Sequence, residues 1–158
     1  MGNLLLAIVM VASAGLFAQS AGQLIEPPPG ARLVLEARGE GAQIYSCTGS
    51  QWKLKAPNAK LLDDSGQVVG THFAGPTWRL NDGSEVKGKM IASQPAPDGK
   101  SIPWLLIEAV PDTGSGKLAA VNYIRRIDTS GGAAPKEACT SGDLPVPYAA
   151  KYSFYASK

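Results

Sequence analysis

The chain has 158 residues, which suits one domain, and 44% of them are hydrophobic, so a packed core is expected along most of its length. The formal net charge is only +2 and the longest basic run is Arg125-Arg126, which argues against the clustered basic surface that nucleic-acid binding requires. Glycine (18 residues) and proline (12 residues) are abundant, which favours short strands and turns over long helices.

The first twenty residues have the pattern of an export signal. Residues 4–18 read LLLAIVMVASAGLFA, which is too short for a transmembrane helix of about 20 residues but typical of a signal peptide. Ala18 and Ser20 are the small residues at −3 and −1 of a cleavage site after Ser20, so we expect residues 1–20 to be removed. Because residues 1–3 carry no Lys or Arg, an uncleaved anchor remains an alternative. We expect a secreted protein, periplasmic if bacterial, without a stable membrane span.

A series of short strands is expected after a proline-rich linker at residues 21–31. The first, RLVLEAR at 32–38, alternates apolar and polar residues as a strand with one buried face does. Turn residues separate the segments that follow. The next expected strands are AQIYSC (42–47), QWKLKA (51–56), AKLLDD (59–64), QVVGTHFA (67–74), TWRL (77–80) and SEVKGKMIA (84–92).

The turn between the last two of these segments is Asn81-Asp82-Gly83. Asp-Gly between two extended runs predicts a tight hairpin in which Gly83 takes positive φ. We expect this hairpin to present His72 and Trp78 at one end of the domain. Trp78 follows a Gly-Pro pair and precedes the polar turn, so we expect it to be the most exposed aromatic residue.

The C-terminal half continues the β pattern. IPWLLIEAV at 102–110 is almost continuously apolar, which predicts a strand covered on both faces. KLAAVNYIRRI follows at 117–127, and in PYAAKYSFYA at 147–156 the alternate residues from Tyr148 to Phe154 share one face. Helical spacing does not persist over three turns anywhere. The expected fold is all-β: a single domain at 32–158, a β-sandwich or partly closed barrel of about nine or ten short strands.

Two cysteines, Cys47 and Cys139, follow the export signal. An even cysteine count in a secreted protein predicts a disulfide that staples the domain, with two buried thiols as the alternative. One histidine and two distant cysteines do not have the close ligand spacing of a zinc site, so we expect no metal. The sequence has neither G-x-G-x-x-G nor GK[ST], so we expect no cofactor.

Five residues are candidates for a binding site, and catalytic residues are not assigned because G-x-S-x-G and a triad pattern are missing. The histidine can act as a general base or contact a ligand, or it is a half-buried strand residue with a hydrogen-bond partner. The tryptophans and the tyrosines, Tyr152 among them, can stack on a ligand or pack in the core. The turn carboxylate can support hydrolysis or cap its own turn. The candidates are His72, Trp78, Asp82, Trp104 and Arg125.

Six ordered segments resemble a family of secreted bacterial and fungal proteins, the domain of unknown function family 3455. They are GEGAQIYSC, HFAGPTW, DGSEVKG, IPWLL, IRRIDTSGGAAP and YAAKYSFY, and the resemblance extends from about residue 26 to residue 156. The family pattern assigns no roles. Some members carry the label malate dehydrogenase, which this sequence contradicts because it lacks the dinucleotide fingerprint and the βαβ alternation. The residues that the resemblance singles out are His72, Gly75, Pro76, Trp78, Asp82, Gly83, Trp104 and Arg125.

Two functions remain open from the sequence. The first is a non-catalytic secreted β-domain that binds a small ligand, a glycan or a cell-surface component, or that has a structural role there. The second is a small extracellular hydrolase that uses His72 with a nearby carboxylate. Convergence of His72, Trp78 and Asp82 in one cleft would indicate an enzyme or a specific binder.

Overall fold

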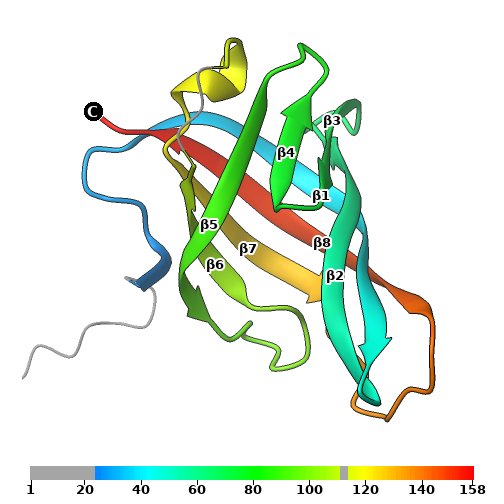
Figure 1. Cartoon of the computed structure of the whole chain (residues 1–158). Coiled ribbons are helices and arrows are strands. Elements are labelled where there is room, and N and C mark those ends of the chain that lie inside the picture. The colour runs from blue at the N-terminus through cyan, green and yellow to red at the C-terminus, as the bar shows by residue number, and fades with distance from the viewer. Residues whose placement is uncertain (1–23, 111–113) are drawn as a thin grey trace, which may run out of the picture.

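The computed structural model describes residues 24–110 and 114–158, and these form a closed antiparallel β-barrel of eight strands (Figure 1). Each strand pairs with the next in the sequence, and β8 returns to pair with β1. The all-β prediction is confirmed; the expected signal peptide at 1–20 lies outside the described residues. The strands are β1 (Arg32–Thr48), β2 (Gln51–Leu62), β3 (Val68–Phe73), β4 (Thr77–Leu80), β5 (Glu85–Gln94), β6 (Trp104–Ala109), β7 (Tyr123–Gly131) and β8 (Asp143–Ala156).

The strand number is lower than the nine or ten expected because some expected segments are continuous. RLVLEAR and AQIYSC form the single strand β1, which stays paired with β8 across Gly39 and Gly41. QWKLKA and AKLLDD likewise join across Pro57 in β2. Residues 117–127 divide instead: Lys117–Ala120 is a short 3-10 helix, η2, and β7 begins at Tyr123. Residue composition predicts which segments are extended, but hydrogen bonding to the neighbouring strands determines where each strand begins and ends.

The up-and-down topology places alternate loops at opposite ends of the barrel. The β2–β3, β4–β5 and β6–β7 connections share the end covered by η2, at the top of Figure 1. Leu118 of η2 is 1% exposed, and its backbone N–H donates to Ser84 Oγ at 3.2 Å. The hairpin loop of β3 and β4 belongs to the other end. The two ends therefore offer different environments to the residues near them.

Inward-pointing residues of β8 form one wall of the core. The shared face from Tyr148 to Phe154 is confirmed, since Tyr152 and Phe154 are 0% exposed. Glycines on adjacent strands make room for large inward side chains: a Cβ at Gly39 would lie 2.5 Å from a ring carbon of Tyr152, and one at Gly88 would lie 2.3 Å from a methyl group of Ile107. Alternation of small and large inward residues is what fills a narrow barrel.

The Asn81-Asp82-Gly83 turn forms as predicted. Gly83 has a φ of 85° and its N–H donates to Leu80 O at 3.0 Å. A Cβ at this position would meet nothing within 4 Å, so the backbone conformation alone favours glycine. The expectation that the turn presents His72 and Trp78 is wrong. The turn lies at the η2 end, whereas both of these residues face the barrel interior nearer the opposite end of their strands.

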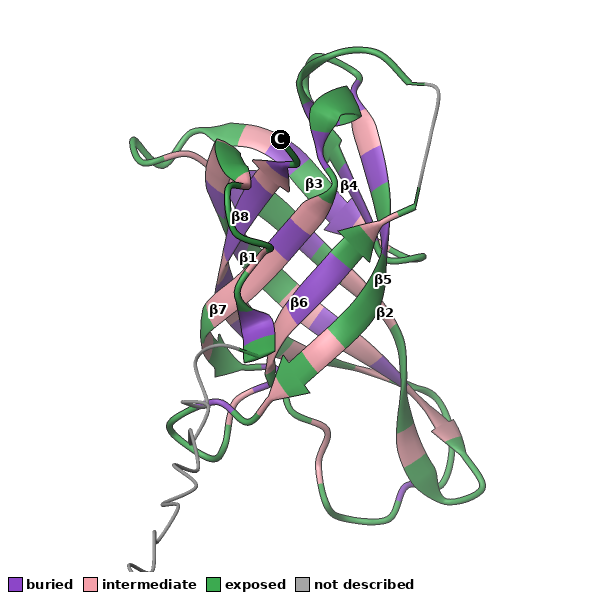
Figure 2. Ribbon diagram, turned by 90° about the vertical axis from the view of Figure 1, so that its left-hand side faces the viewer, coloured by how far each residue is buried: buried purple, intermediate pink, exposed green. Residues whose placement is uncertain are grey.

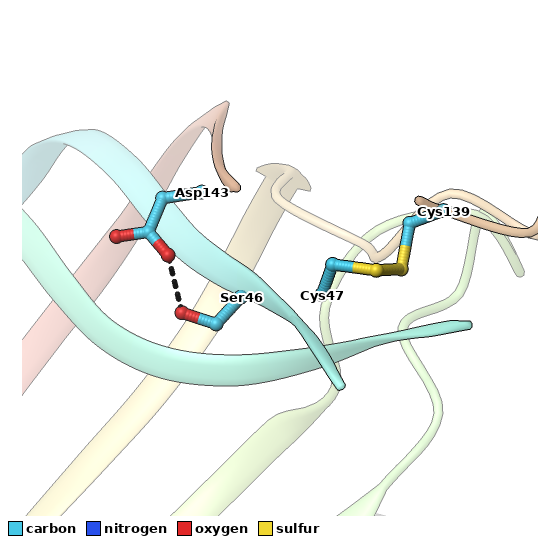
Figure 3. Close-up of a disulfide and its surroundings, with 4 residues drawn as sticks. All are labelled: Ser46, Cys47, Cys139 and Asp143. Carbon is cyan, nitrogen blue, oxygen red and sulfur yellow. Dashed lines mark hydrogen bonds between the residues drawn. A yellow bond between two sulfur atoms is a disulfide. The ribbon is translucent and has the colours of Figure 1, made fainter. Parts of the chain in front are cut away.

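The predicted disulfide joins Cys47 and Cys139, whose Cα atoms are 5.7 Å apart (Figure 3). The disulfide connects the C-terminal end of β1 to the β7–β8 loop. Backbone bonds reinforce this junction, because Cys47 N–H donates to Gly142 O at 2.9 Å and Cys139 N–H donates to Ser50 O at 3.2 Å. The Ser46 hydroxyl also donates to the carboxylate of Asp143, as Figure 3 shows.

The segment before β1 packs against the outside of the barrel on the β6–β7 side (Figure 2). Ile25 is 0% exposed, and Glu26 forms an ion pair with Arg125 of β7 at 2.5 Å. Leu106 of β6 pairs with Arg125 and is 6% exposed, while Ile107 on the inner face is 3% exposed. β6 is thus covered on both faces, as its apolar run predicts. In 24–110 and 114–158, no helix has the length and apolar character to cross a membrane.

Candidate functional site

The hairpin of β3 and β4 brings two of the candidate residues together. His72 and Trp78 are directly opposite in the ladder, and their rings stack with centroids 4.3 Å apart and planes 8° apart. Both point into the barrel, where they are 3% and 1% exposed. The expectation that Trp78 is the exposed aromatic is wrong. The alternation in TWRL places Trp78 on the same inner face as Leu80, and burial of a large ring favours that face.

His72 is held in one tautomer. Its Nδ1 lies 2.8 Å from the carbonyl oxygen of Thr77, which can only accept, so Nδ1 carries the proton and donates. Burial lowers the pKa of His72 to about 4; the bond to Thr77 opposes this, and the positive charge of Arg126 adds to it. The imidazole is therefore neutral at pH 7, and its Nε2 is a hydrogen-bond acceptor.

Because the pKa of His72 is lowered on folding, we expect the protein to lose stability as the pH falls. In the unfolded chain the histidine is protonated near pH 6.5, whereas in the folded chain it stays neutral down to about pH 4. Acidification therefore favours the unfolded state. Between about pH 7.5 and pH 5 the free energy of unfolding should fall by about 2 kcal/mol. His72 is the only histidine, so urea unfolding of His72→Gln should lack this slope. An equal slope in both proteins would contradict the assignment.

A cavity of about 510 Å³ reaches this ring pair from the outside. β3 and β4 are short, and their loop at Gly75 and Pro76 ends partway along the longer neighbours β2 and β5 (Figure 1). The cavity opens between β2 and β5, beyond the end of the β3–β4 hairpin. Its mouth carries the exposed apolar side chains Leu54 of β2 and Met90 of β5. Hereafter it is called the side cavity.

The inner part of the side cavity combines aromatic, aliphatic and basic groups. Trp78 and Tyr152 meet edge to face with centroids 5.7 Å apart. Arg126 of β7 pairs with Tyr152 in the ladder, so it faces inward beside the rings. Its Nε and Nη2 donate to the carbonyl oxygen of Pro103 at 3.1 and 2.8 Å. The floor is an apolar surface with one fixed cation.

Asp82 lies at the η2 end and does not join His72 and Trp78. Its Oδ1 accepts from the hydroxyl and the backbone N–H of Ser84, and its Oδ2 accepts from the Lys117 N–H at 3.1 Å. The Ser84 hydroxyl and, next, the Lys117 N–H hold the pKa of Asp82 below its usual range. This carboxylate connects the β4–β5 turn to η2. Within 24–110 and 114–158, no group of three His, Cys, Asp or Glu side chains could hold a metal ion.

Trp104 and Arg125 lie on the outer face of the barrel. Each directly precedes a residue of the side cavity, Leu105 and Arg126 respectively, and neighbours in a strand point to opposite faces. Arg125 is occupied by its ion pair with Glu26. Of the five candidates, the fold thus brings together His72 and Trp78 and disperses the other three.

Sequence reasoning included Tyr152 only among the aromatic residues that could stack on a ligand, and it missed Arg126 and Gln43 as lining residues of the side cavity. A usable signal was present for Arg126. In IRRI, the residues two apart share a face, so Arg126 lies on the face of the apolar Ile124, and Arg125 lies on the other. A basic residue on the core face of a strand is unusual and marks a candidate contact.

Residues 27–156 match the family model described as "Protein of unknown function (DUF3455)". The matched range includes all eight strands of the barrel. No curated protein and no solved structure matches the chain. The family match covers most of the sequence and confirms the resemblance of the six ordered segments. This chain belongs to the DUF3455 family of proteins of unknown function.

Proposed function

We propose that this chain is an exported, non-catalytic binding protein that holds one small ligand in the side cavity. The observation that carries the proposal is the cavity itself, about 510 Å³, lined by His72 and Trp78 within an eight-stranded barrel. Barrels of this strand number have room for one small ligand, and ligand pockets commonly enclose roughly 300–1,000 Å³. Export is supported by the leader pattern at 1–20 and by the Cys47–Cys139 disulfide.

The hydrolase alternative requires a carboxylate beside His72. The position next to Nδ1, where a catalytic carboxylate would orient the ring, is taken by the Thr77 carbonyl. Asp82 is engaged at the other end of the barrel with Ser84 and Lys117. Binding is therefore the function that the geometry favours.

Occupation of the side cavity can be tested with N-phenyl-1-naphthylamine, an uncharged apolar dye that fluoresces when it leaves water. We expect saturable binding of about one dye per protein. Ser93 lines the cavity and pairs with Leu105 on the inner face of the barrel, so Ser93→Trp should fill the cavity and weaken binding roughly tenfold or more.

The matched control is Ala120→Trp, which adds the same indole to an exposed residue of η2 at the other end. It should bind the dye as the unchanged protein does. Circular dichroism and the melting temperature verify that Ser93→Trp is folded. Equal binding by all three proteins, or a signal that never saturates, would refute a ligand site in the cavity.

A further inference from the structure

Arg126 is a cation in an apolar cavity whose charge the described chain does not neutralise. Two basic residues line the side cavity, Lys55 at the mouth and Arg126 inside. Lys55 forms an ion pair with Asp143 at 2.5 Å. Arg126 pairs with no carboxylate among residues 24–110 and 114–158. A cation that is partly removed from water without a counter-charge is costly, and an anionic ligand would offset that cost.

The protein holds the guanidinium of Arg126 along one edge. The two bonds to Pro103 O use the Nε–Nη2 edge, which fixes the guanidinium plane. Besides this carbonyl oxygen, the guanidinium meets the Tyr152 hydroxyl, and its planar end matches the two oxygens of a carboxylate. Trp78 also lines the cavity and is 1% exposed, and its buried indole N–H has no hydrogen-bond partner in the described chain.

The remaining lining restricts the rest of the ligand. His72 is neutral and stacked on Trp78, and the aliphatic side chains Leu105 and Ile107 of β6 also line the cavity. The exposed Leu54 and Met90 extend the apolar surface to the mouth. A dianion such as a phosphate monoester would need a second unpaired cation, whereas a carboxylate needs one. The rest of the ligand should be apolar, because the walls of the side cavity are mostly apolar.

We propose that the ligand of the side cavity is a small carboxylic acid with an apolar body, whose carboxylate binds Arg126. This inference rests on the proposed function and specifies its ligand. The probes are 1-naphthaleneacetate and 1-naphthaleneethanol, which share the ring and differ in a carboxylate or a hydroxyl group. Their affinities are measured by displacement of N-phenyl-1-naphthylamine.

The acid should bind roughly tenfold more tightly than the alcohol, because a charged hydrogen bond is worth more than a neutral one. Arg126→Gln should weaken acid binding by roughly tenfold or more and leave alcohol binding unchanged, and Arg126→Lys should retain part of the preference. The matched control is Arg125→Gln, which removes the neighbouring charge on the outer face and should leave both affinities unchanged. Melting temperatures verify that each variant is folded.

Three outcomes would overturn the inference: equal affinities for acid and alcohol, equal weakening of both by Arg126→Gln, or the same loss of acid preference in Arg125→Gln. If the dye still binds and Ser93→Trp still excludes it, these outcomes reject the carboxylate but leave the proposal of a ligand cavity intact. If the dye and both probes fail to bind, the proposed function and the inference fail together.

Discussion

Removal of the Cys47–Cys139 disulfide should lower the free energy of unfolding by about 4–5 kcal/mol. The bridge spans 92 residues, and in the chain-entropy model a loop of that size restricts the unfolded chain by about this amount. The native junction keeps other contacts, including the bonds of Cys47 N–H to Gly142 O and of Lys55 to Asp143. We therefore expect the barrel to stay folded, with its unfolding midpoint shifted to lower denaturant.

The measurement is equilibrium urea unfolding of the unchanged protein and of the double variant Cys47→Ser, Cys139→Ser. The control is a repeat in reductant, which should destabilise the unchanged protein and leave the double variant unaffected. A decrease of less than about 1 kcal/mol in the free energy of unfolding would contradict the explanation by the entropy of the 92-residue loop.

Trp78→Ala should cost about 3–5 kcal/mol, the range for truncation of a large buried aromatic residue. Trp78 is 1% exposed and contacts the rings of His72, Tyr152 and Phe154, so its removal leaves a void among three aromatic neighbours. The void joins the side cavity, which Trp78 lines. We expect dye binding to change as well, because the stacked partner of His72 is lost.

Trp52→Ala is the matched control, since it removes the same atoms from a half-buried position near the tip of the β1–β2 hairpin. It should cost clearly less than Trp78→Ala and leave dye binding unchanged. Urea unfolding and dye titration of both variants test this. Equal costs for the two variants would contradict the central role of Trp78. A costly Trp78→Ala with normal dye affinity would show that the ring is structural only.

Local sequence patterns were sufficient to predict three features of the structure. Alternation in PYAAKYSFYA identified the inner face of β8, because side chains of a strand alternate whatever it pairs with. Asp82-Gly83 identified the β4–β5 turn, because the requirement for positive φ is met within a few residues. The export pattern and the cysteine count predicted the disulfide, since the chemistry of cysteine depends on the compartment.

Only the tertiary structure decided which of these residues share a site. Closure of the barrel requires β8 to pair with β1, and no short segment encodes an interaction between strands so far apart in the chain. The side cavity exists because β3 and β4 end before their neighbours, which is a relation among four strands. The same assembly sends Asp82 to the η2 end and turns Arg126 toward the aromatic rings while Arg125 binds Glu26 outside. Local sequence sets the face of each side chain, but strand length and register set its neighbours.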